Sequence, residues 1–375
     1  MNSEITAITM PKWGLTMTEG KVVGWVKQQG QSFAEGEELL EIETTKITNV
    51  MEAPAGGTLR RIVAAAGATL PVGALLAVVA PEEVRDGEID TFVAGFAIPE
   101  PTADLPVDSE DAKPRELEAA GLRLRYLELG EGDSVPVLLL HGFGADLNTW
   151  MFTQPALAEG GQVIALDLPG HGGSAKHLDR VDAESLAAII DHARNALGIE
   201  RLHLIGHSMG GGIAISFALR RPECVATLTL ISSASLGPEI NAAFIDGFVR
   251  AARRREAIEA LKLLVHDPAL VSRTMVEDVL RYKRLDGVPE ALAAFAEEWF
   301  PGGRQRIAFS DAVAALKLPV QIIWGRDDRI IPVAHAEALA SRVPVHILEQ
   351  TGHLPHMEKA GEVSRLIKRL IENQA

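Results

Sequence analysis

An apolar run, a tight turn around a serine and the start of a helix follow one another in RLHLIGHSMGGGIAI, residues 201–215. The turn is a Gly-x-Ser-x-Gly sequence centred on Ser208. Its small neighbours allow a strained backbone that lifts the serine hydroxyl clear of the chain. Such a turn needs a buried strand before it and a helix behind it. This stretch therefore favours a sheet covered by helices, with Ser208 as the predicted nucleophile.

Apolar runs of strand length alternate with helical stretches on both sides of this turn. The runs are VPVLLLHG, QVIALDL, ATLTLISS and VQIIWG. They are typical of buried parallel strands in βαβ units. We expect an α/β domain over residues 116–375. Helical stretches interrupt the alternation over about residues 236–312, and we expect them to form a cap over the site.

A serine hydroxyl is a weak nucleophile until an oriented base takes its proton. Asp327 and Asp328 follow the VQIIWG strand, and His353 and His356 follow the next strand. The chain order Ser, acid, His is that of one known arrangement of a catalytic triad. Either aspartate and either histidine could complete it.

These motifs together resemble the alpha/beta-hydrolase fold over residues 122–372. The resemblance favours Asp328, which has an Asp-x-x-x-Pro spacing, with Asp327 as the alternative, and it favours His353 over His356 as the base. The loop LLLHGFGADLNTW resembles the HG-x loop of that fold. This resemblance implies an oxyanion hole formed by the backbone amides of Phe143 and Met209. His171, in the family hallmark DLPGHGGS, has no expected catalytic role.

Residues 81–115 differ in composition from the rest of the chain. They carry 3 basic and 10 acidic side chains and five prolines, a composition typical of an extended, self-repelling linker. We therefore place a domain boundary there. Within the segment, four apolar residues spaced as on one helix face predict a short helix: Ile89, Phe92, Val93 and Phe96. That helix would dock on its own chain or serve as a docking site for a partner subunit.

Residues 1–80 consist of short alternating strands separated by glycine-containing turns, which predicts a small all-β sandwich. Pairing ELLEIET with ITNVMEA as a hairpin leaves Lys46 at the turn. The segment resembles the lipoyl domains of 2-oxo acid dehydrogenase complexes, which implies covalent lipoyl attachment to Lys46. Biotin acceptors normally have methionine on both sides of the lysine, whereas Thr45 and Ile47 stand here. Biotinylation and an unmodified relic of the fold are the alternatives.

The combined architecture resembles the dihydrolipoyllysine acetyltransferase component of acetoin dehydrogenase complexes. The resemblance implies transfer of an acetyl group from lipoyl-Lys46 to coenzyme A. It also implies a thiamine-diphosphate-dependent subunit and a dihydrolipoyl dehydrogenase as partners, and a homo-oligomer. With water as acceptor, the same triad would make a serine hydrolase or thioesterase. A C-terminal domain acting only as a scaffold is a third possibility.

Charge and composition restrict the remaining possibilities. A net charge of -15 argues against a nucleic-acid partner. A single cysteine, Cys224, permits no internal disulfide, and we expect a cytoplasmic protein without a membrane span or a metal site. The stretch 250–306 is slightly positive, with 11 basic and 9 acidic side chains. It is either a solvated helical surface or a surface that binds a phosphorylated acyl acceptor such as coenzyme A.

Overall fold

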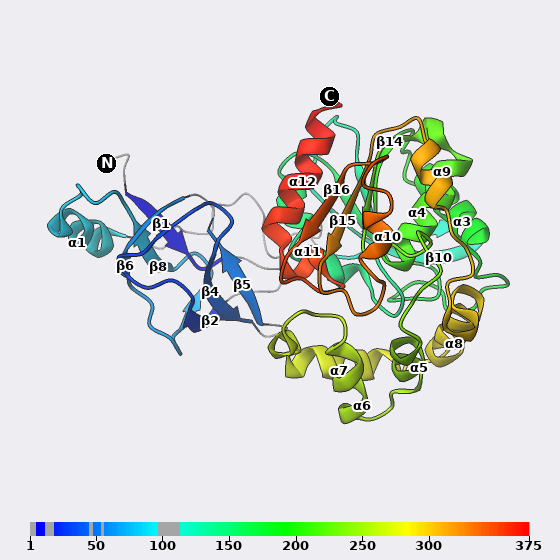
Figure 1. Ribbon diagram of the computed structural model, residues 1–375, viewed down its shortest axis with the longest axis horizontal. Helices are drawn as coiled ribbons and strands as arrows, with labels where there is room; N and C mark the ends of the chain where they lie inside the picture. Colours follow the sequence, from blue (N-terminus) through cyan, green and yellow to red (C-terminus); the bar gives the residue numbers. More distant parts are fainter. Residues whose placement is uncertain (1–4, 12–18, 45–47, 54–55, 97–112, 375) are drawn as a thin grey trace. The chain divides into compact units, whose positions relative to one another are not determined.

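The computed structural model describes residues 5–11, 19–44, 48–53, 56–96 and 113–374. The chain divides into an N-terminal and a C-terminal compact unit (Figure 1). The N-terminal unit is all β apart from one helix, and the C-terminal unit is a mainly parallel sheet flanked by helices. The predicted fold class is confirmed for both parts. No helix in the described part of the chain is both long and apolar enough to cross a membrane.

The N-terminal unit contains two four-stranded sheets. One has the order β1-β8-β6-β3 and the other β5-β4-β2-β7. The strands are β1 (Thr6–Thr9), β2 (Glu19–Trp25), β3 (Ser32–Phe33), β4 (Glu38–Glu43), β5 (Thr48–Glu52), β6 (Gly57–Ile62), β7 (Thr69–Pro71) and β8 (Leu75–Val79). Apolar side chains of both sheets, including Ile8, Val22, Leu40 and Leu59, form one buried core. The expected sandwich is present.

The predicted hairpin is formed by β4 and β5. The two strands pair antiparallel with Glu43 opposite Thr48, so residues 44–47 connect them. Lys46 lies outside the described residues, together with Thr45 and Ile47. The modification of Lys46 therefore stays a prediction.

The short helix expected within residues 81–115 is α1 (Asp86–Gly95), and it packs on its own chain. Ile89 is fully buried in a cluster with β8 residues Leu75 and Val78. Two ion pairs join β6 to the polar side of the helix. Arg60 Nη2 lies 3.1 Å from Asp86 Oδ1, and Arg61 Nη1 lies 2.6 Å from Asp90 Oδ1. The N-terminal folded unit thus includes the first part of the segment that composition marks as a linker.

The C-terminal unit is built on an eight-stranded sheet with the order β16-β15-β14-β13-β11-β12-β10-β9. Strands β11 to β16 run parallel, whereas β10 pairs antiparallel with β9 and β12. The strands are β9 (Arg115–Ala119), β10 (Leu122–Leu129), β11 (Val137–Leu140), β12 (Val163–Leu166), β13 (Leu202–His207), β14 (Val225–Ile231), β15 (Val320–Gly325) and β16 (Val345–Leu348). Every residue of β11 to β15 is buried, as the near-continuous apolar runs require.

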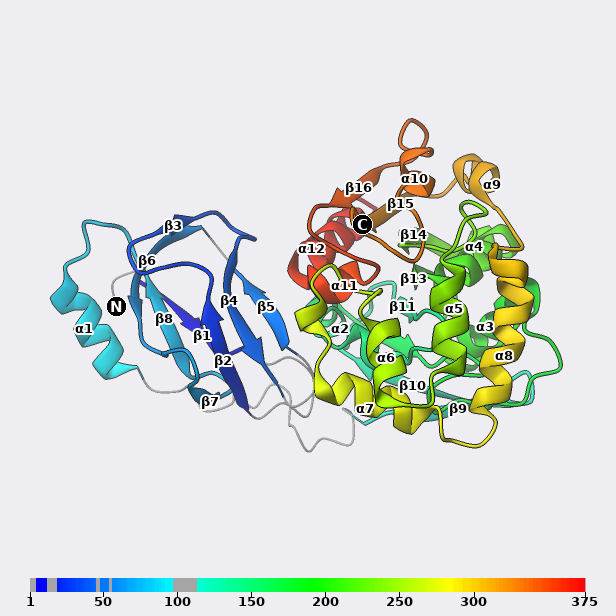
Figure 2. The same cartoon turned by 60° about the horizontal axis from the view of Figure 1, so that its bottom comes forward.

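Helices cover both faces of this sheet (Figures 1 and 2). On one side lie α2 (Gln154–Ala158), α11 (Pro355–Glu358) and α12 (Ala360–Glu372), and on the other α3 (Ala183–Ala196) and α4 (Met209–Arg220). Between β14 and β15 come the cap helices α5 (Ala242–Arg250), α6 (Arg254–Leu261), α7 (Arg273–Tyr282) and α8 (Val288–Trp299), followed by α9 (Ser310–Ala315). The short α10 (Ala334–Glu337) follows β15. The cap helices occupy the part of the sequence where a cap is predicted.

We expect Ile89→Ala to destabilise the N-terminal unit by about 3 kcal/mol, because it leaves a cavity where α1 meets β8. Hydrogen exchange of the β8 amides in the full-length protein would measure the change. Thr91→Ala, at an exposed position of the same helix, is the matched control and should shift stability by less than about 0.5 kcal/mol. Equal protection in both variants would show that α1 is not part of the unit's core.

Candidate active site

Ser208 lies at the sharp turn between β13 and α4. Its backbone has φ 51° and ψ -120°, in a region that non-glycine residues rarely adopt. The turn is tight enough to require both glycines of the motif. An added Cβ at Gly206 would come 2.4 Å from the carbonyl oxygen of Gly210, and one at Gly210 would come 2.4 Å from that of Leu140. The predicted strand, turn and helix are therefore present, with Ser208 at the carboxyl end of a central strand.

Ser208, His353 and Asp328 form one line of hydrogen bonds. Ser208 Oγ lies 3.0 Å from His353 Nε2, and His353 Nδ1 lies 2.8 Å from Asp328 Oδ2. The other carboxylate oxygen, Asp328 Oδ1, accepts from the backbone amides of Ile330 and Ile331. The side chains of His353 and Asp328 are 3% and 0% exposed, so water cannot compete for these bonds. This is the order of nucleophile, base and orienting carboxylate used in acyl transfer.

The two alternative residues lie elsewhere. The Asp327 carboxylate points to His266 of the cap segment, with 2.9 Å between Oδ2 and Nδ1. His356 is fully buried, and its Nε2 lies 3.0 Å from Thr149 Oγ1. Neither contacts Ser208. The structure brings Asp328 and His353 together with Ser208 and leaves Asp327 and His356 outside the line.

A buried carboxylate, Glu358, holds the loop that carries His353. Its Oε1 accepts from the amides of Gly352 (2.9 Å) and Leu354 (3.3 Å), and its Oε2 accepts from the amide of His266 (2.7 Å). Burial raises the pKa of Glu358, against the lowering effect of these three backbone donors. The sequence analysis missed this residue. A lone glutamate five positions after the histidine, next to the final helix, is the signal that could have found it.

The cap contributes directly to the same loop through residues 262–266, the cap strap. Leu264 O accepts from the amide of His353 at 2.8 Å. Arg329, next to Asp328, donates from Nη2 to the carbonyl oxygens of Lys262 (2.5 Å) and Val265 (2.6 Å). The cap strap therefore touches the loops of both the base and the acid. Sequence periodicity gives no sign of this contact, because backbone carbonyls make it.

The loop after β11 lies directly against the serine. An added Cβ at Gly142 would come 3.0 Å from Ser208 Cβ. Within the residues that the structure describes, the amides of Phe143 and Met209 have no intramolecular acceptor. Two free amides on either side of a nucleophile are what an oxyanion hole requires. Their role there remains a prediction.

His141 fixes the shape of this loop. Its Nδ1 lies 2.8 Å from the carbonyl oxygen of Gly142, to which it donates, and its Nε2 accepts from the amide of Leu168 at 2.9 Å. Both bonds require a neutral ring. Burial lowers the pKa of His141 to about 4, so the ring is neutral at physiological pH. Burial likewise lowers the pKa values of His171 and His356 to about 3.

Residues 141–146 form the loop after β11, which we call the oxyanion loop after its predicted role, and aromatic rings enclose it on the cap side. Phe143 packs edge-on against Phe248 of α5 and against Phe300, with ring centroids 5.9 and 6.0 Å apart. Phe295 of α8 packs against His171, which in turn contacts Phe143. All five rings are buried. The cap therefore builds an apolar wall against the loop that lies next to Ser208.

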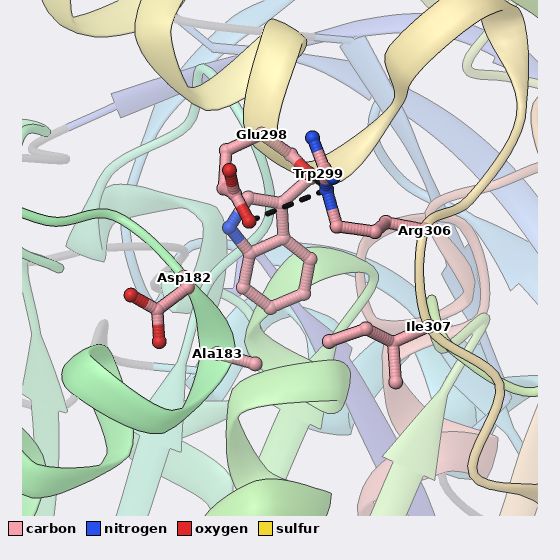
Figure 3. Close-up of a pocket in the computed structure, with 6 residues that line it drawn as sticks. All are labelled: Asp182, Ala183, Glu298, Trp299, Arg306 and Ile307. Atoms are coloured by element: carbon pink, nitrogen blue, oxygen red, sulfur yellow. Dashed lines mark hydrogen bonds and ion pairs between the residues drawn. The ribbon is translucent and has the colours of Figure 1, made fainter.

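A separate small cavity lies at the junction of α3 and α8 and does not include the triad residues (Figure 3). Its volume is about 10 Å³, and it is lined by Asp182, Ala183, Glu298, Trp299, Arg306 and Ile307. Arg306 is paired with Glu298 there, at 3.3 Å. A cavity of this size has room for about one water molecule, so it is not a substrate site.

Two families match this chain. The alpha/beta hydrolase fold family matches residues 135–360, and the family described as biotin-requiring enzymes matches residues 6–79. The solved structures that resemble the chain include a meta-cleavage product hydrolase of Pseudomonas fluorescens IP01. It is 26% identical with a TM-score of 0.64, over 71% of this chain and 99% of that one. A thermophilic esterase of Thermogutta terrifontis is 27% identical with a TM-score of 0.57, over 70% and 99%.

Two curated relatives match nearly the full length. Both are named dihydrolipoyllysine-residue acetyltransferase component of acetoin cleaving system. The protein of Pseudomonas putida is 45% identical over 97% of each chain. That of Cupriavidus necator is 43% identical, again over 97% of each chain.

The neighbouring aspartates offer a matched pair of substitutions. We expect Asp328→Asn to reduce the initial rate of 4-nitrophenyl acetate cleavage by about 10³-fold or more, because the base loses its orienting carboxylate. Asp327→Asn makes the same chemical change one residue away, where the contact is to His266, and should cost less than about tenfold. Similar losses in the two variants would contradict the assignment of Asp328.

Acid should destabilise the C-terminal unit. Five buried histidines have folded-state pKa values below the unfolded value of about 6.5: His141, His171, His203, His207 and His356. The unfolded chain therefore binds more protons, and the unfolding free energy falls as pH drops below that value. His356, with a pKa of about 3, should account for about 1.4 kcal/mol per pH unit between pH 6 and 4. Urea unfolding of His356→Gln should show a pH slope smaller by that amount. An unchanged slope would contradict the prediction.

Proposed function

The chain belongs to the family of dihydrolipoyllysine-residue acetyltransferase components of acetoin-cleaving systems, and on that premise we propose that Ser208, His353 and Asp328 transfer an acetyl group between a lipoyl thiol on Lys46 and coenzyme A. The observation that carries the proposal is the combination of a lipoyl-type domain and an acyl-transfer site in one chain. The hydrogen-bond line from Ser208 through His353 to Asp328 supports the proposed roles.

The N-terminal unit is suited to hold a lipoyl group. Strands β4 and β5 pair up to Glu43 and Thr48, so four residues of the sequence connect two paired strands. Lys46 is the lysine among them. When attached, the lipoyl group supplies a thiol that carries the acetyl group as a thioester. Lipoic acid is thus the proposed covalent cofactor and coenzyme A the proposed co-substrate.

The first half of the proposed reaction acylates the serine. Ser208 Oγ attacks the thioester carbonyl carbon while His353 Nε2 takes its proton, and Asp328 keeps the imidazole oriented through Nδ1. The amides of Phe143 and Met209 donate to the carbonyl oxygen as it becomes negative. His353 then returns the proton to the departing sulfur, which leaves an acetyl ester on Ser208.

The second half reverses these roles with another thiol. His353 takes the proton from the incoming coenzyme A sulfur, which attacks the acetyl ester carbon. Ser208 leaves and regains its proton from His353. One acetyl group has moved from one sulfur to another, and both Ser208 and His353 are restored.

The alternative is hydrolysis, in which water takes the place of the second thiol. The aromatic wall around the oxyanion loop favours transfer, because Phe143, Phe248, Phe295 and Phe300 are all below 9% exposed. An apolar enclosure limits the access of water to an acyl ester. Under this proposal the triad could catalyse either hydrolysis or transfer, and the cap favours transfer by limiting the access of water.

The proposed setting is a cytoplasmic catabolic complex. Membership of an acetoin-cleaving system implies other subunits. We propose that these are a thiamine-diphosphate-dependent subunit that loads the lipoyl group and a dihydrolipoyl dehydrogenase that reoxidises it. A homo-oligomer is also part of the proposal.

Peptide mapping and rate measurements on the lipoylated full-length protein test this function. We expect a lipoyl adduct on Lys46 that is lost in Lys46→Ala. Ser208→Ala should lower the rate of acetyl transfer between the lipoyl group and coenzyme A by about 10³-fold or more. Ser216→Ala, in the helix that follows Ser208, is the matched control and should keep nearly the full rate. Transfer that persists in Ser208→Ala, or acetyl released only as acetate, would refute the proposal.

A further inference from the structure

Four basic residues lie at the ends of three cap helices, and we call them the cap basic cluster: Arg250, Arg253, Lys283 and Arg284. Arg250 ends α5, Arg253 precedes α6, and Lys283 and Arg284 follow α7. Figure 2 shows α5, α6 and α7 lying together in the cap. The whole chain carries a net charge of -15, so the sign of this cluster is opposite to the net charge of the protein.

Lys283 ties these elements together. Its ammonium group donates to the carbonyl oxygens of Phe248, Val249 (3.2 Å) and Ala251 (2.5 Å) at the carboxyl end of α5. It also lies 5.3 Å from the centroid of the Phe248 ring. The start of α6 is fixed by Glu256, whose carboxylate accepts from the amides of Ala252 (2.9 Å) and Arg253 (3.0 Å). The backbone that carries the cluster is therefore well defined.

The charges of the cluster are not neutralised by ion pairs. Among the described residues, no carboxylate lies within ion-pair distance of Arg250, Arg253 or Arg284, and all three side chains are exposed. Glu256 is the acidic group that Arg253 and Lys283 share. Its pKa is lowered first by its two backbone hydrogen bonds and then by these two cations. The cluster therefore keeps an excess of positive charge.

The cluster is connected to the active site through one residue of α5. Phe248 packs so closely on the oxyanion loop that an added Cβ at Gly144 would come 2.3 Å from its ring. Arg250 follows two residues later in the same helix, a rise of about 3 Å. A chain of contacts thus leads from Ser208 to Gly142 and from Gly144 of the same loop to Phe248, in the helix that ends at Arg250.

We propose that the three arginines of the cap basic cluster bind the phosphate groups of the nucleotide part of coenzyme A while its thiol reaches Ser208, and that Lys283 holds the backbone that carries them. This inference rests on the proposed function and adds the subsite that would recognise the acceptor. Guanidinium groups suit phosphate because they offer paired donors in a fork. The pantetheine arm has the length of about four to five extended residues, roughly 15 Å. The inference therefore requires the thiol of such an arm to reach Ser208 while the nucleotide stays at the cluster.

Two measurements on the lipoylated full-length protein test the inference. Calorimetry follows the binding of adenosine 3′,5′-bisphosphate, which has the phosphates of the nucleotide but no thiol. Steady-state kinetics compares coenzyme A with pantetheine, which has the thiol but no nucleotide. We expect Arg253→Glu and Arg284→Glu each to weaken binding of the bisphosphate about tenfold or more. Each substitution should also raise the KM for coenzyme A relative to the KM for pantetheine by a similar factor. Binding to wild type should weaken as salt increases.

Arg201→Glu is the matched control for charge reversal. Arg201 is exposed and precedes β13, a full strand length from Ser208, and this change should leave both readouts at the wild-type value. If Arg253→Glu and Arg284→Glu raise both KM values equally, or bind the bisphosphate as wild type does, the inference is overturned. Thermal unfolding confirms that each variant is folded, and Arg250→Glu replaces any that is not.

The outcomes separate this inference from the function on which it rests. If wild type transfers acetyl to neither thiol yet binds the bisphosphate through Arg253 and Arg284, the proposed function fails and the phosphate subsite stands. If wild type transfers acetyl to coenzyme A without binding the bisphosphate, the function stands and the subsite is refuted.

Discussion

The strained backbone of Ser208 is the constraint on which the rest of the site depends. A positive φ at a serine costs free energy, and the surrounding structure must hold it in place. Gly206 and Gly210 allow the chain to approach itself and the end of β11 at distances that no side chain would permit. The buried strands on either side of β13 make this turn rigid. The backbone of Ser208 is therefore fixed by the sheet and helix rather than by contacts of its own side chain.

His353, the proposed base, is positioned by different contacts. His353 lies in a loop, which a sheet alone cannot position, and Glu358 gathers three backbone amides around it. One of these amides belongs to the cap strap, which also contacts the base through Leu264 and the acid loop through Arg329. A change in the cap would thus reach the acid and the base together. This arrangement gives the cap a part in positioning the triad as well as in enclosing the substrate.

Under the proposed function, the two units of the chain divide the chemistry in a way that explains why they are joined. A lipoylated lysine can deliver an acyl group but cannot activate it, whereas a buried triad can activate an acyl group but cannot bring it in. Joining them on one chain raises the effective concentration of one for the other. In the proposed reaction, the aromatic wall of Phe143, Phe248, Phe295 and Phe300 favours a thiol over water as the acyl acceptor.

The sequence by itself determined the fold class, because the periodicity of apolar residues follows directly from which strand faces are buried. It also predicted Ser208 as the nucleophile and narrowed the predicted acid and base to two candidates each, since local motifs set which residues end the strands. Only the tertiary structure separated Asp328 from Asp327, because adjacent residues of one loop point to different partners. It alone revealed how Glu358 and the cap strap hold the loop of His353, and how Lys283 joins α7 to α5 in the cap basic cluster. The contacts that join the cap to the His353 loop link residues about 90 positions apart, and those of Lys283 link residues 32 to 35 positions apart. No local pattern records contacts over such separations.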